Sequence, residues 1–305
     1  MKVEQQLRSL PKMRFLPRKV KDVLALSSRI FERQEVPEPS SSACYLLADV
    51  MGHKTVTTMN MQTIMTQKHL EQFWDFCRKR LKREPVQYII GEWDFCDITL
   101  KMKPPVLIPR RETEELVNLV EEELNTRFPN GATVLDVGCG SGAISLALAK
   151  HRPNDRIMAV DMSLDACCLT RENAKMLNLA DRVAIHHLEV EAGTIGIGGC
   201  DKFDMIISNP PYIRNDNMQQ LAPEVAWYED HHALCGGMSG METIRKVLLF
   251  SCSALNINGS LWLEVALDQP HVLQRYVARF LPMLRFVGTY TDFSNRLRFC
   301  KLKKL

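Results

Sequence analysis

The most constraining feature of this sequence is an apolar run that leads through a glycine-rich loop into a second apolar run. Residues 133–137 read Thr-Val-Leu-Asp-Val, and residues 138–142 read Gly-Cys-Gly-Ser-Gly. Ala143, Ile144 and Leu146 then follow at helical spacing. A buried strand, a glycine loop and a helix in this order predict a parallel α/β sheet whose loop approaches a ligand with its backbone.

An acidic residue ends the next predicted strand, at 156–160. Asp161 lies about 20 residues beyond the loop, where a carboxylate can accept hydrogen bonds from both hydroxyls of a ribose. The loop lacks the third glycine of a dinucleotide-binding loop, and Asp136 adds negative charge where a pyrophosphate would bind. These features favour S-adenosylmethionine, which has a ribose, a sulfonium and an amino-acid end. Asp136 would help to orient the ammonium group directly or through the loop; the alternative is that it only stabilises the loop.

A second candidate site follows the apolar run at 203–207. Asn209, Pro210, Pro211 and Tyr212 come next. Two prolines cannot continue a strand, so they predict a rigid loop at the carboxyl edge of the sheet, where open α/β sheets bind ligands. The Asn209 amide, the Pro210 carbonyl and the Tyr212 ring are suited to holding a planar NH2 group. The alternative is a turn that only ends the strand.

The rest of the carboxyl-terminal part continues the alternation of strands and helices. The pattern predicts helices at 164–177, 241–255 and 268–280, and strands at 182–188, 260–265, 284–290 and 296–303. Glu189 and Val190 follow the third strand and are the candidates for an adenine pocket, because an acid there can accept a hydrogen bond from the adenine amino group. Residues 213–230 read as a long active-site loop.

The amino-terminal part predicts a small helical domain without a catalytic constellation, whose role would be recognition. Helices are expected at 20–33, from a cap within Ser40–Ser42 to Val50, and from a cap at Thr66 to Arg83. Five basic residues gather at the end of the third helix: Arg78, Lys79, Arg80, Lys82 and Arg83. They would form either a solvated face or a surface for an acidic or RNA-bound partner.

These patterns divide the chain into four parts. We expect a basic tail or targeting segment at 1–19, a helical recognition domain at 20–84, a linking β-hairpin at 85–105 and a catalytic domain at 106–305. The hairpin would pair residues 87–95 with 98–100, and Thr113 would cap a helix at 114–124.

Composition excludes several other classes. Apolar residues make up 46% of the 305 and charged residues 25%, as in ordinary globular proteins, and no apolar run approaches a membrane span. A net charge of +3 permits a nucleic-acid partner without arguing for one. Ten cysteines without a C-x-x-C pair and eight histidines without ligand spacing predict reduced thiols and no metal site. The basic residues of 1–21 fit either a mitochondrial presequence or a disordered tail.

Asp-Val-Gly-Cys-Gly-Ser-Gly at 136–142 and Asn-Pro-Pro-Tyr at 209–212 together resemble class I S-adenosylmethionine-dependent methyltransferases that act on planar amino groups. The run Val-Leu-Ile-Pro-Arg-Arg-Glu-Thr-Glu at 106–114, the Gly-Glu-Trp-Asp-Phe stretch at 91–95 and the helical amino-terminal domain narrow the resemblance. Residues 20–303 are similar to the release-factor glutamine methyltransferases (HemK/PrmC family). Arg111 departs from the family pattern, which usually has a second proline there.

The resemblance implies a fold, a reaction and site residues. The expected fold is α/β: a Rossmann-like, mostly parallel seven-stranded sheet with a small all-helical domain before it. The expected reaction is N5-methylation of the glutamine in the Gly-Gly-Gln motif of peptide-chain release factors. Cofactor binding would fall to Gly138, Cys139, Gly140, Ser141, Gly142, Asp161, Glu189, Val190 and Asn209. Substrate binding would fall to Asn209, Pro210, Pro211 and Tyr212, of which Asn209, Pro210 and Tyr212 would be catalytic.

Two other functions stay open at this stage. Asn-Pro-Pro-Tyr also serves adenine-N6 methylation of DNA or RNA, although no nucleic-acid-binding module is recognisable. A non-catalytic S-adenosylmethionine-binding scaffold is the other. The expected partner is a release factor, with ribosome association as an open alternative. We expect a monomer without membrane or stable nucleic-acid binding, and a mitochondrial location with a cytoplasmic one as the alternative.

Overall fold

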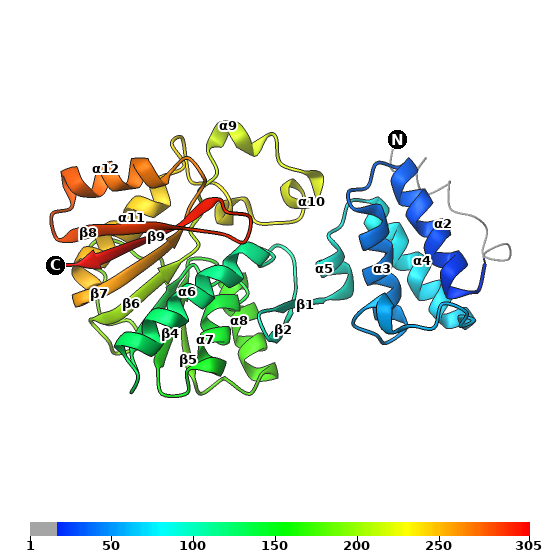
Figure 1. Cartoon of the computed structure of the whole chain (residues 1–305), viewed down its shortest axis with the longest axis horizontal. Coiled ribbons are helices and arrows are strands. Elements are labelled where there is room, and N and C mark those ends of the chain that lie inside the picture. Colours follow the sequence, from blue (N-terminus) through cyan, green and yellow to red (C-terminus); the bar gives the residue numbers. More distant parts are fainter. Residues whose placement is uncertain (1–16) are drawn as a thin grey trace. The chain divides into compact units, whose positions relative to one another are not determined.

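The computed structural model describes residues 17–305, which form two compact units (Figure 1). Residues up to Glu92 together with Ala222–Tyr228 make the first unit, and Trp93–Leu221 with Glu229–Leu305 make the second. The predicted basic tail or targeting segment lies outside the described residues except for its last three positions. The domain boundaries predicted at 84 and 105 stay a prediction.

The first unit is helical. Its helices are α2 (Val20–Arg33), α3 (Pro39–Val50), α4 (Gln67–Leu81), α5 (Val86–Ile90) and α10 (Pro223–Ala226). Helix α2 has the predicted bounds, and Thr66 caps α4 as predicted, because its hydroxyl accepts a hydrogen bond from the His69 N–H at 3.2 Å. The cap predicted within Ser40–Ser42 is wrong: α3 already begins at Pro39, whose missing N–H costs nothing in a first turn.

The basic cluster at the end of α4 binds within its own unit. Arg80 is 4% exposed, and its Nη1 donates to Glu224 Oε1 at 2.8 Å, while Arg83 Nε donates to the same oxygen at 2.6 Å. The Tyr228 hydroxyl donates to the Lys82 carbonyl at 2.9 Å. These contacts attach residues 222–228 to the helical unit, so Arg80 and Arg83 have a structural role that neither sequence-based alternative included.

The segment predicted as the first strand of the linking hairpin is partly helical. Residues Val86–Ile90 form α5, and the two-stranded sheet is shorter, with β1 at Glu92–Phe95 and β2 at Ile98–Lys101. Pro85 precedes the helix and Gly91 ends it with a φ of 86°, a left-handed conformation that favours glycine. Tyr88, Ile89 and Ile90 are residues that favour strands, but the flanking Pro85 and Gly91 fit a helix start and stop.

The second unit contains a seven-stranded sheet in the order β5-β4-β3-β6-β7-β9-β8. Its strands are β3 (Thr133–Val137), β4 (Arg156–Asp161), β5 (Val183–His187), β6 (Phe203–Ser208), β7 (Leu255–Glu264), β8 (Leu284–Thr291) and β9 (Leu297–Lys304). The pairs from β5 to β7 are parallel, and β9 is antiparallel to both of its neighbours. The predicted mostly parallel seven-stranded sheet is therefore confirmed.

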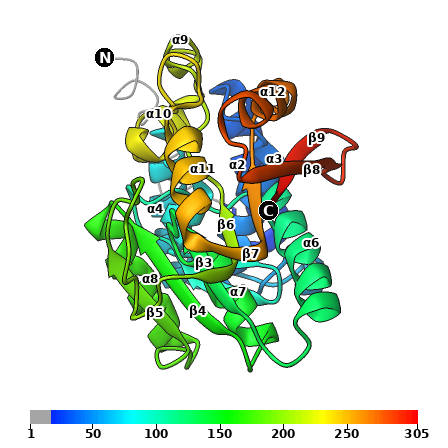
Figure 2. The same ribbon diagram turned by 90° about the vertical axis from the view of Figure 1, so that its left-hand side faces the viewer.

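Helices cover both faces of this sheet. They are α6 (Arg111–Arg127), α7 (Ala143–His151), α8 (Leu164–Met176), α11 (Glu242–Ala254) and α12 (Pro270–Phe280). Strands β4 and β5 are added on one side of β3, whereas β6 and β7 are added on the other. Right-handed crossovers in opposite directions place their helices on opposite faces, and Figure 2 shows α6 and α11 on different sides of the central strands. The direction changes between β3 and β6, where such sheets bind ligands.

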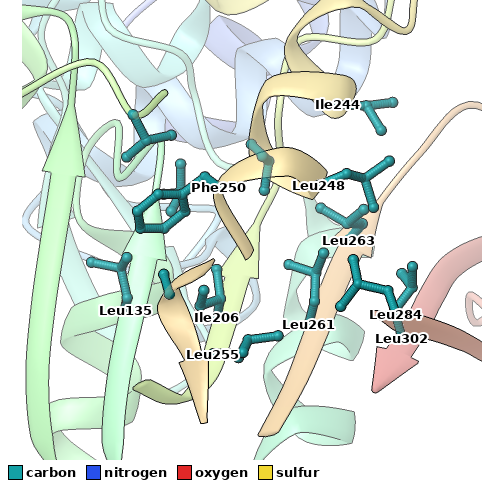
Figure 3. Close-up of a cluster of buried hydrophobic side chains, with 14 of the residues drawn as sticks. Leu135, Ile206, Ile244, Leu248, Phe250, Leu255, Leu261, Leu263, Leu284 and Leu302 are labelled. Atoms are coloured by element: carbon teal, nitrogen blue, oxygen red, sulfur yellow. The ribbon is translucent and has the colours of Figure 1, made fainter. Parts of the chain in front are cut away.

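One apolar core of the second unit lies between the sheet and helices α11 and α12. Figure 3 shows Leu135, Ile206 and Leu261 from three strands facing Leu248 and Phe250 from α11. Each of these side chains is fully buried. Burial of one such side chain stabilises a fold by about 1.5–3 kcal/mol, so this layer holds the carboxyl ends of the strands in place.

Thr113 does not cap a helix as predicted. Helix α6 begins at Arg111, and Thr113 lies in its first turn, 3% exposed. Its hydroxyl donates to Glu264 Oε2 at 2.8 Å instead of accepting from the helix backbone. The predicted loop at 213–230 also contains a short helix, α9 (Asn215–Met218), besides α10.

The remaining composition-based points concern thiols, metals and membranes. All ten cysteines carry free thiols. Across residues 17–305, no three His, Cys, Asp or Glu side chains come close enough together to hold a metal ion. None of the described helices combines the length and the apolar character needed to cross a membrane.

Candidate active site

One pocket of about 910 Å³, counted out to its open mouth, lies at the carboxyl ends of β3, β4 and β6. Many of the residues predicted to act on cofactor or substrate line it: Gly138, Gly140, Asp161, Glu189, Val190, Asn209, Pro210 and Pro211. The two motifs identified in the sequence therefore lie in one pocket of the second unit.

The three glycines of the loop have different roles. Gly138 and Gly140 line the pocket with φ values of 79° and 58°, and a Cβ on either would meet nothing within 4 Å. The space that a side chain would take is therefore left open to a ligand. Gly142 does not line the pocket, because a Cβ there would lie 2.8 Å from both Leu146 Cδ1 and Thr170 Cγ2. It allows the loop to pack on the helices.

Cys139 and Ser141 alternate with the glycines and are buried behind the loop. Cys139 is 5% exposed, with its Sγ 3.5 Å from Thr170 Oγ1. The Ser141 carbonyl accepts a hydrogen bond from Asn173 Nδ2 at 2.9 Å. Neither residue lines the pocket, and the Cys139 thiol and the Ser141 carbonyl bind to α8 behind the loop.

Asp161 is fixed by the backbone on both of its oxygens. Oδ2 accepts from the Gly140 N–H at 2.9 Å, and Oδ1 accepts from the Ser163 N–H at 2.8 Å. Burial raises the pKa of Asp161, while these two N–H groups favour its ionised form. The carboxylate thus has a set orientation in the pocket and keeps further lone pairs for ribose hydroxyls.

Asp136 lies beneath the loop rather than in the pocket lining. It is 1% exposed, and its Oδ2 accepts from the Ser145 N–H at 3.2 Å. Its Oδ1 has no hydrogen-bond partner among residues 17–305. Burial raises the pKa of Asp136 to about 7, so the negative charge on this group is sensitive to what the loop binds. This geometry favours the sequence-based alternative in which Asp136 acts through the loop.

The predicted adenine end combines one buried and one exposed residue. Val190 is 6% exposed and packs in the apolar core, while Glu189 forms an ion pair with Lys246 of α11. Met162 and Ala166 line the same pocket from the β4–α8 connection and α8. Val190, Met162 and Ala166 thus give an apolar wall, with the ion-paired Glu189 beside it. Sequence reasoning missed the contributions of Lys246 and α11, because they come from residues far along the chain.

Asn209 is oriented by a residue almost a hundred positions earlier in the chain. Its Nδ2 donates to Thr113 Oγ1 at 3.2 Å, which leaves the acceptor oxygen on the other arm of the amide. The Tyr212 hydroxyl lies 3.3 Å from Glu264 Oε1, and burial raises the Tyr212 pKa. Tyr212 does not line the pocket and packs against the apolar core.

Glu264 is a site residue that sequence reasoning missed. It is 1% exposed at the carboxyl end of β7 and accepts from both Thr113 and Tyr212. The signal was present: a single acid at the end of an otherwise apolar strand, Leu261–Leu263, at the ligand-binding edge of the sheet.

Another side of the pocket is held by an ion pair between two loops. Arg110 Nη2 donates to both carboxylate oxygens of Glu229, at 2.6 and 2.8 Å, and the Asp230 N–H donates to the Pro105 carbonyl at 2.7 Å. Burial raises the pKa of Glu229, and Arg110 opposes this shift. Val106 and Asp230 then line the pocket from the two joined loops.

This pocket fits S-adenosylmethionine. Open space beside Gly138 and Gly140 admits the amino-acid end, the fixed Asp161 carboxylate suits the ribose, and the apolar wall suits the adenine. The buried acid beneath the loop, with one oxygen unpartnered among the described residues, suits a ligand that carries positive charge.

Comparisons with known proteins agree with this description. Residues 22–91 match the family model of the PrmC N-terminal domain, and residues 113–227 match that of the methyltransferase small domain. The human MTRF1L release factor glutamine methyltransferase is 40% identical over 285 residues, which cover 90% of this chain and 84% of the relative. The Streptococcus pneumoniae release factor glutamine methyltransferase is 35% identical over 231 residues, covering 76% of this chain and 79% of the relative.

A solved structure shares the fold. The hMettl16 catalytic domain, determined in complex with the MAT2A 3'UTR hairpin 6, superposes with a TM-score of 0.52 at 14% identity, covering 75% of this chain and 81% of the other. At this identity the likeness concerns the fold alone.

Proposed function

Since this chain belongs to the family of release factor glutamine methyltransferases, we propose that it methylates N5 of the glutamine in the Gly-Gly-Gln motif of peptide-chain release factors, using S-adenosylmethionine. The observation that carries this proposal is the shared pocket. Asn209 and Pro210 line the same cavity as Gly138, Gly140 and Asp161, so the residues proposed for the acceptor lie beside those proposed for the cofactor.

The cofactor would be held mainly by groups of β3, β4 and the loops after them. Gly138 and Gly140 would admit its amino-acid end, Asp161 its ribose, and Val190 its adenine. S-adenosylmethionine, when bound, supplies an electrophilic methyl group. Cys139, Ser141 and Gly142 would act by keeping the loop in shape, and Glu189 by closing the adenine end together with Lys246.

The glutamine would be held by two acceptors. A carboxamide nitrogen is a poor nucleophile because its lone pair is delocalised into the carbonyl. The Asn209 Oδ1 and the Pro210 carbonyl can each accept one N–H of this NH2 group, which aims the nitrogen and discourages its planarity. Alignment of this kind can lower a barrier by several kcal/mol, up to about 7–11 in favourable cases. Pro211 would border the pocket, and Tyr212 would brace the loop through Glu264.

The test is methyl transfer from radiolabelled S-adenosylmethionine to a purified release factor. A Gly-Gly-Ala variant of the factor and a DNA or RNA oligomer serve as matched acceptors. We expect label on the wild-type factor and none on the variant.

Label on the oligomer would assign adenine-N6 methylation instead. No label on any acceptor, despite measurable cofactor binding, would assign a non-catalytic scaffold. Either result would overturn the proposal.

The helical unit would bind the body of the release factor. This rests on the match of residues 22–91 to a domain of the same family and on the lack of a catalytic constellation in that range. Deleting or exchanging exposed residues of α2 and α4 should raise the KM for the release factor but leave transfer to a short Gly-Gly-Gln peptide unchanged. We expect the chain to act as a monomer, which its molar mass in solution would test.

We further propose a mitochondrial location. The support is the sequence of residues 1–21, where seven basic residues stand against one acid, Glu4. The full chain with a carboxyl-terminal fluorescent tag should accumulate in mitochondria, and replacing the seven basic residues with serine should leave it in the cytoplasm. A cytoplasmic signal from the unaltered chain would overturn this proposal.

A further inference from the structure

Glu264 is a buried carboxylate that the transfer step does not use. It accepts from Thr113 Oγ1 at 2.8 Å through Oε2 and from the Tyr212 hydroxyl at 3.3 Å through Oε1. Burying a charged group costs free energy unless it is paired or hydrogen-bonded. Burial raises the pKa of Glu264, whereas the two hydroxyl donors and the nearby Arg298 guanidinium favour its ionised form, and Glu112 opposes it.

The direction of these hydrogen bonds decides which way the Asn209 amide faces. An ionised carboxylate only accepts, so the Thr113 hydroxyl must give its single hydrogen to Glu264. The Thr113 oxygen can then only accept from Asn209, which must present its NH2 group, and Nδ2 indeed lies 3.2 Å away. The acceptor Oδ1 is thereby left for the substrate.

We propose that the Glu264–Thr113 pair fixes the orientation of the Asn209 amide and so makes the site selective for a carboxamide over a carboxylate. This inference rests on the proposed function and adds to it the reason why glutamine, and not glutamate, is accepted. Thr113 and Glu264 are positioning residues, because they act through Asn209.

Selectivity follows from matching donors to acceptors. A glutamine NH2 brings two donors to two acceptors, the Asn209 Oδ1 and the Pro210 carbonyl. A glutamate carboxylate brings only acceptors, so it would face these oxygens without a hydrogen bond. If the Asn209 amide could flip, its NH2 group would face the substrate and donate to a glutamate carboxylate. The selectivity for glutamine would then fall.

The experiment compares release factors with Gly-Gly-Gln, Gly-Gly-Glu and Gly-Gly-Ala motifs. Their Kd values are measured against the full chain in the presence of S-adenosylhomocysteine, so that weakly active variants remain measurable. For the wild-type chain we expect Gly-Gly-Glu to bind at least about tenfold more weakly than Gly-Gly-Gln and no better than Gly-Gly-Ala.

Thr113→Val removes the hydroxyl at nearly constant shape and frees the Asn209 amide. We expect the Glu/Gln ratio of Kd values to fall by about tenfold. Thr113→Ser keeps the hydroxyl and should restore the wild-type ratio. Glu264→Gln can donate to Thr113, which lets Thr113 donate to Asn209, so this variant should lower the ratio by another route. If Thr113→Val does not fold, Glu264→Gln alone still tests the inference.

A ratio that stays within twofold of wild type in a folded Thr113→Val or Glu264→Gln chain would overturn the inference. If Thr113 and Glu264 had a purely structural role, the variants would bind all three release factors more weakly by the same factor. The ratio would then stay unchanged, which would also overturn the inference. Failure of the proposed function would look different, since the wild-type chain would then neither bind nor methylate the Gly-Gly-Gln factor.

Discussion

Two walls of the pocket, one proposed for the cofactor and one for the substrate, are built in different ways. The cofactor wall, at the ribose and the amino-acid end, is made by backbone and by one carboxylate that backbone N–H groups hold, all within residues 138–163. The wall proposed for the substrate is made by side chains that hold each other across 96 and 151 positions, in the pairs Asn209–Thr113 and Thr113–Glu264. Local turns are therefore enough to shape the first wall, whereas the second exists only once the sheet and α6 have packed.

This difference can be tested most strongly at Asn209. Asn209→Ala should lower kcat for release-factor methylation by about 10²–10³-fold, the usual effect of removing one group that stabilises the transition state. The Kd for S-adenosylmethionine should change by less than about fivefold, because the backbone wall is left intact. Radiolabel transfer and calorimetry measure the two quantities.

Asn217→Ala is the matched control for that change, since Asn217 is exposed on the loop after Tyr212. It should leave both quantities at wild-type values. Equal loss of transfer and of cofactor binding in Asn209→Ala would show that the two walls are not separable.

The pH dependence of stability tests whether Asp136, buried beneath the glycine loop, is the group that titrates. Burial raises its pKa from 3.8 to about 7, so the folded chain holds a proton that the unfolded chain has lost. Stability therefore falls as pH rises from about 4 to about 7, by up to about 1.36 kcal/mol per unit. Asp136→Asn keeps an acceptor for the Ser145 N–H and removes the charge.

For this variant we expect the free energy of unfolding to rise relative to wild type more at pH 8 than at pH 5, by up to about 3 kcal/mol. Denaturant unfolding at the two pH values measures it, and Asp165→Asn on the surface of α8 serves as control. An equal change at both pH values would mean that Asp136 is not the group that titrates.

Two matched glycine substitutions in the cofactor wall distinguish the space left for the ligand from the packing of the loop on the helices. Gly140→Ala and Gly142→Ala both place a side chain at positive φ, which costs about 1–2 kcal/mol. Only Gly142→Ala also drives a Cβ into Leu146 and Thr170, adding about 1–3 kcal/mol to its loss of stability. Gly140→Ala should instead weaken cofactor binding, by about tenfold, because its Cβ takes space in the pocket.

Thermal unfolding and cofactor titration of the two variants give the comparison. Weaker binding in Gly142→Ala than in Gly140→Ala would contradict the assignment of Gly140 to the ligand and of Gly142 to packing.

The smallest effect is expected in the helical unit. Glu224→Ala removes the carboxylate between Arg80 and Arg83, with side-chain exposures of 5% and 22% for the two arginines and 15% for Glu224. We expect a loss of about 1–2 kcal/mol, because the buried Arg80 loses a charged partner, and faster proteolysis between residues 219 and 230. Asp216→Ala, an exposed change on the same loop, should show neither. Unchanged cleavage in Glu224→Ala would mean that the ion pairs do not hold this segment.

The sequence predicted the features that depend on neighbouring residues and missed those that depend on residues far apart in the chain. Helix α2, the cap at Thr66 and the strand–loop–helix unit at 133–151 were predicted because each depends on neighbours within a few residues. The first part of the strand expected at 87–95 is helical instead, because Pro85 and Gly91 start and stop a helix around Ile89 and Ile90. Thr113 was misassigned because its hydroxyl is bound by Glu264, which no local pattern connects with it.

The return of residues 222–228 to the helical unit has a consequence for protein synthesis. Residues 17–92 leave the ribosome before the 129 residues at 93–221, and only then does Glu224 follow. Glu224 follows Arg83 by 141 positions and Arg80 by 144, so at about 5–20 residues per second it is made roughly 7–29 s after them. The unit that begins the chain is thus completed only after residues 93–221 of the other unit have been made, and a nascent chain halted before residue 222 would leave Arg80 and Arg83 without their carboxylate.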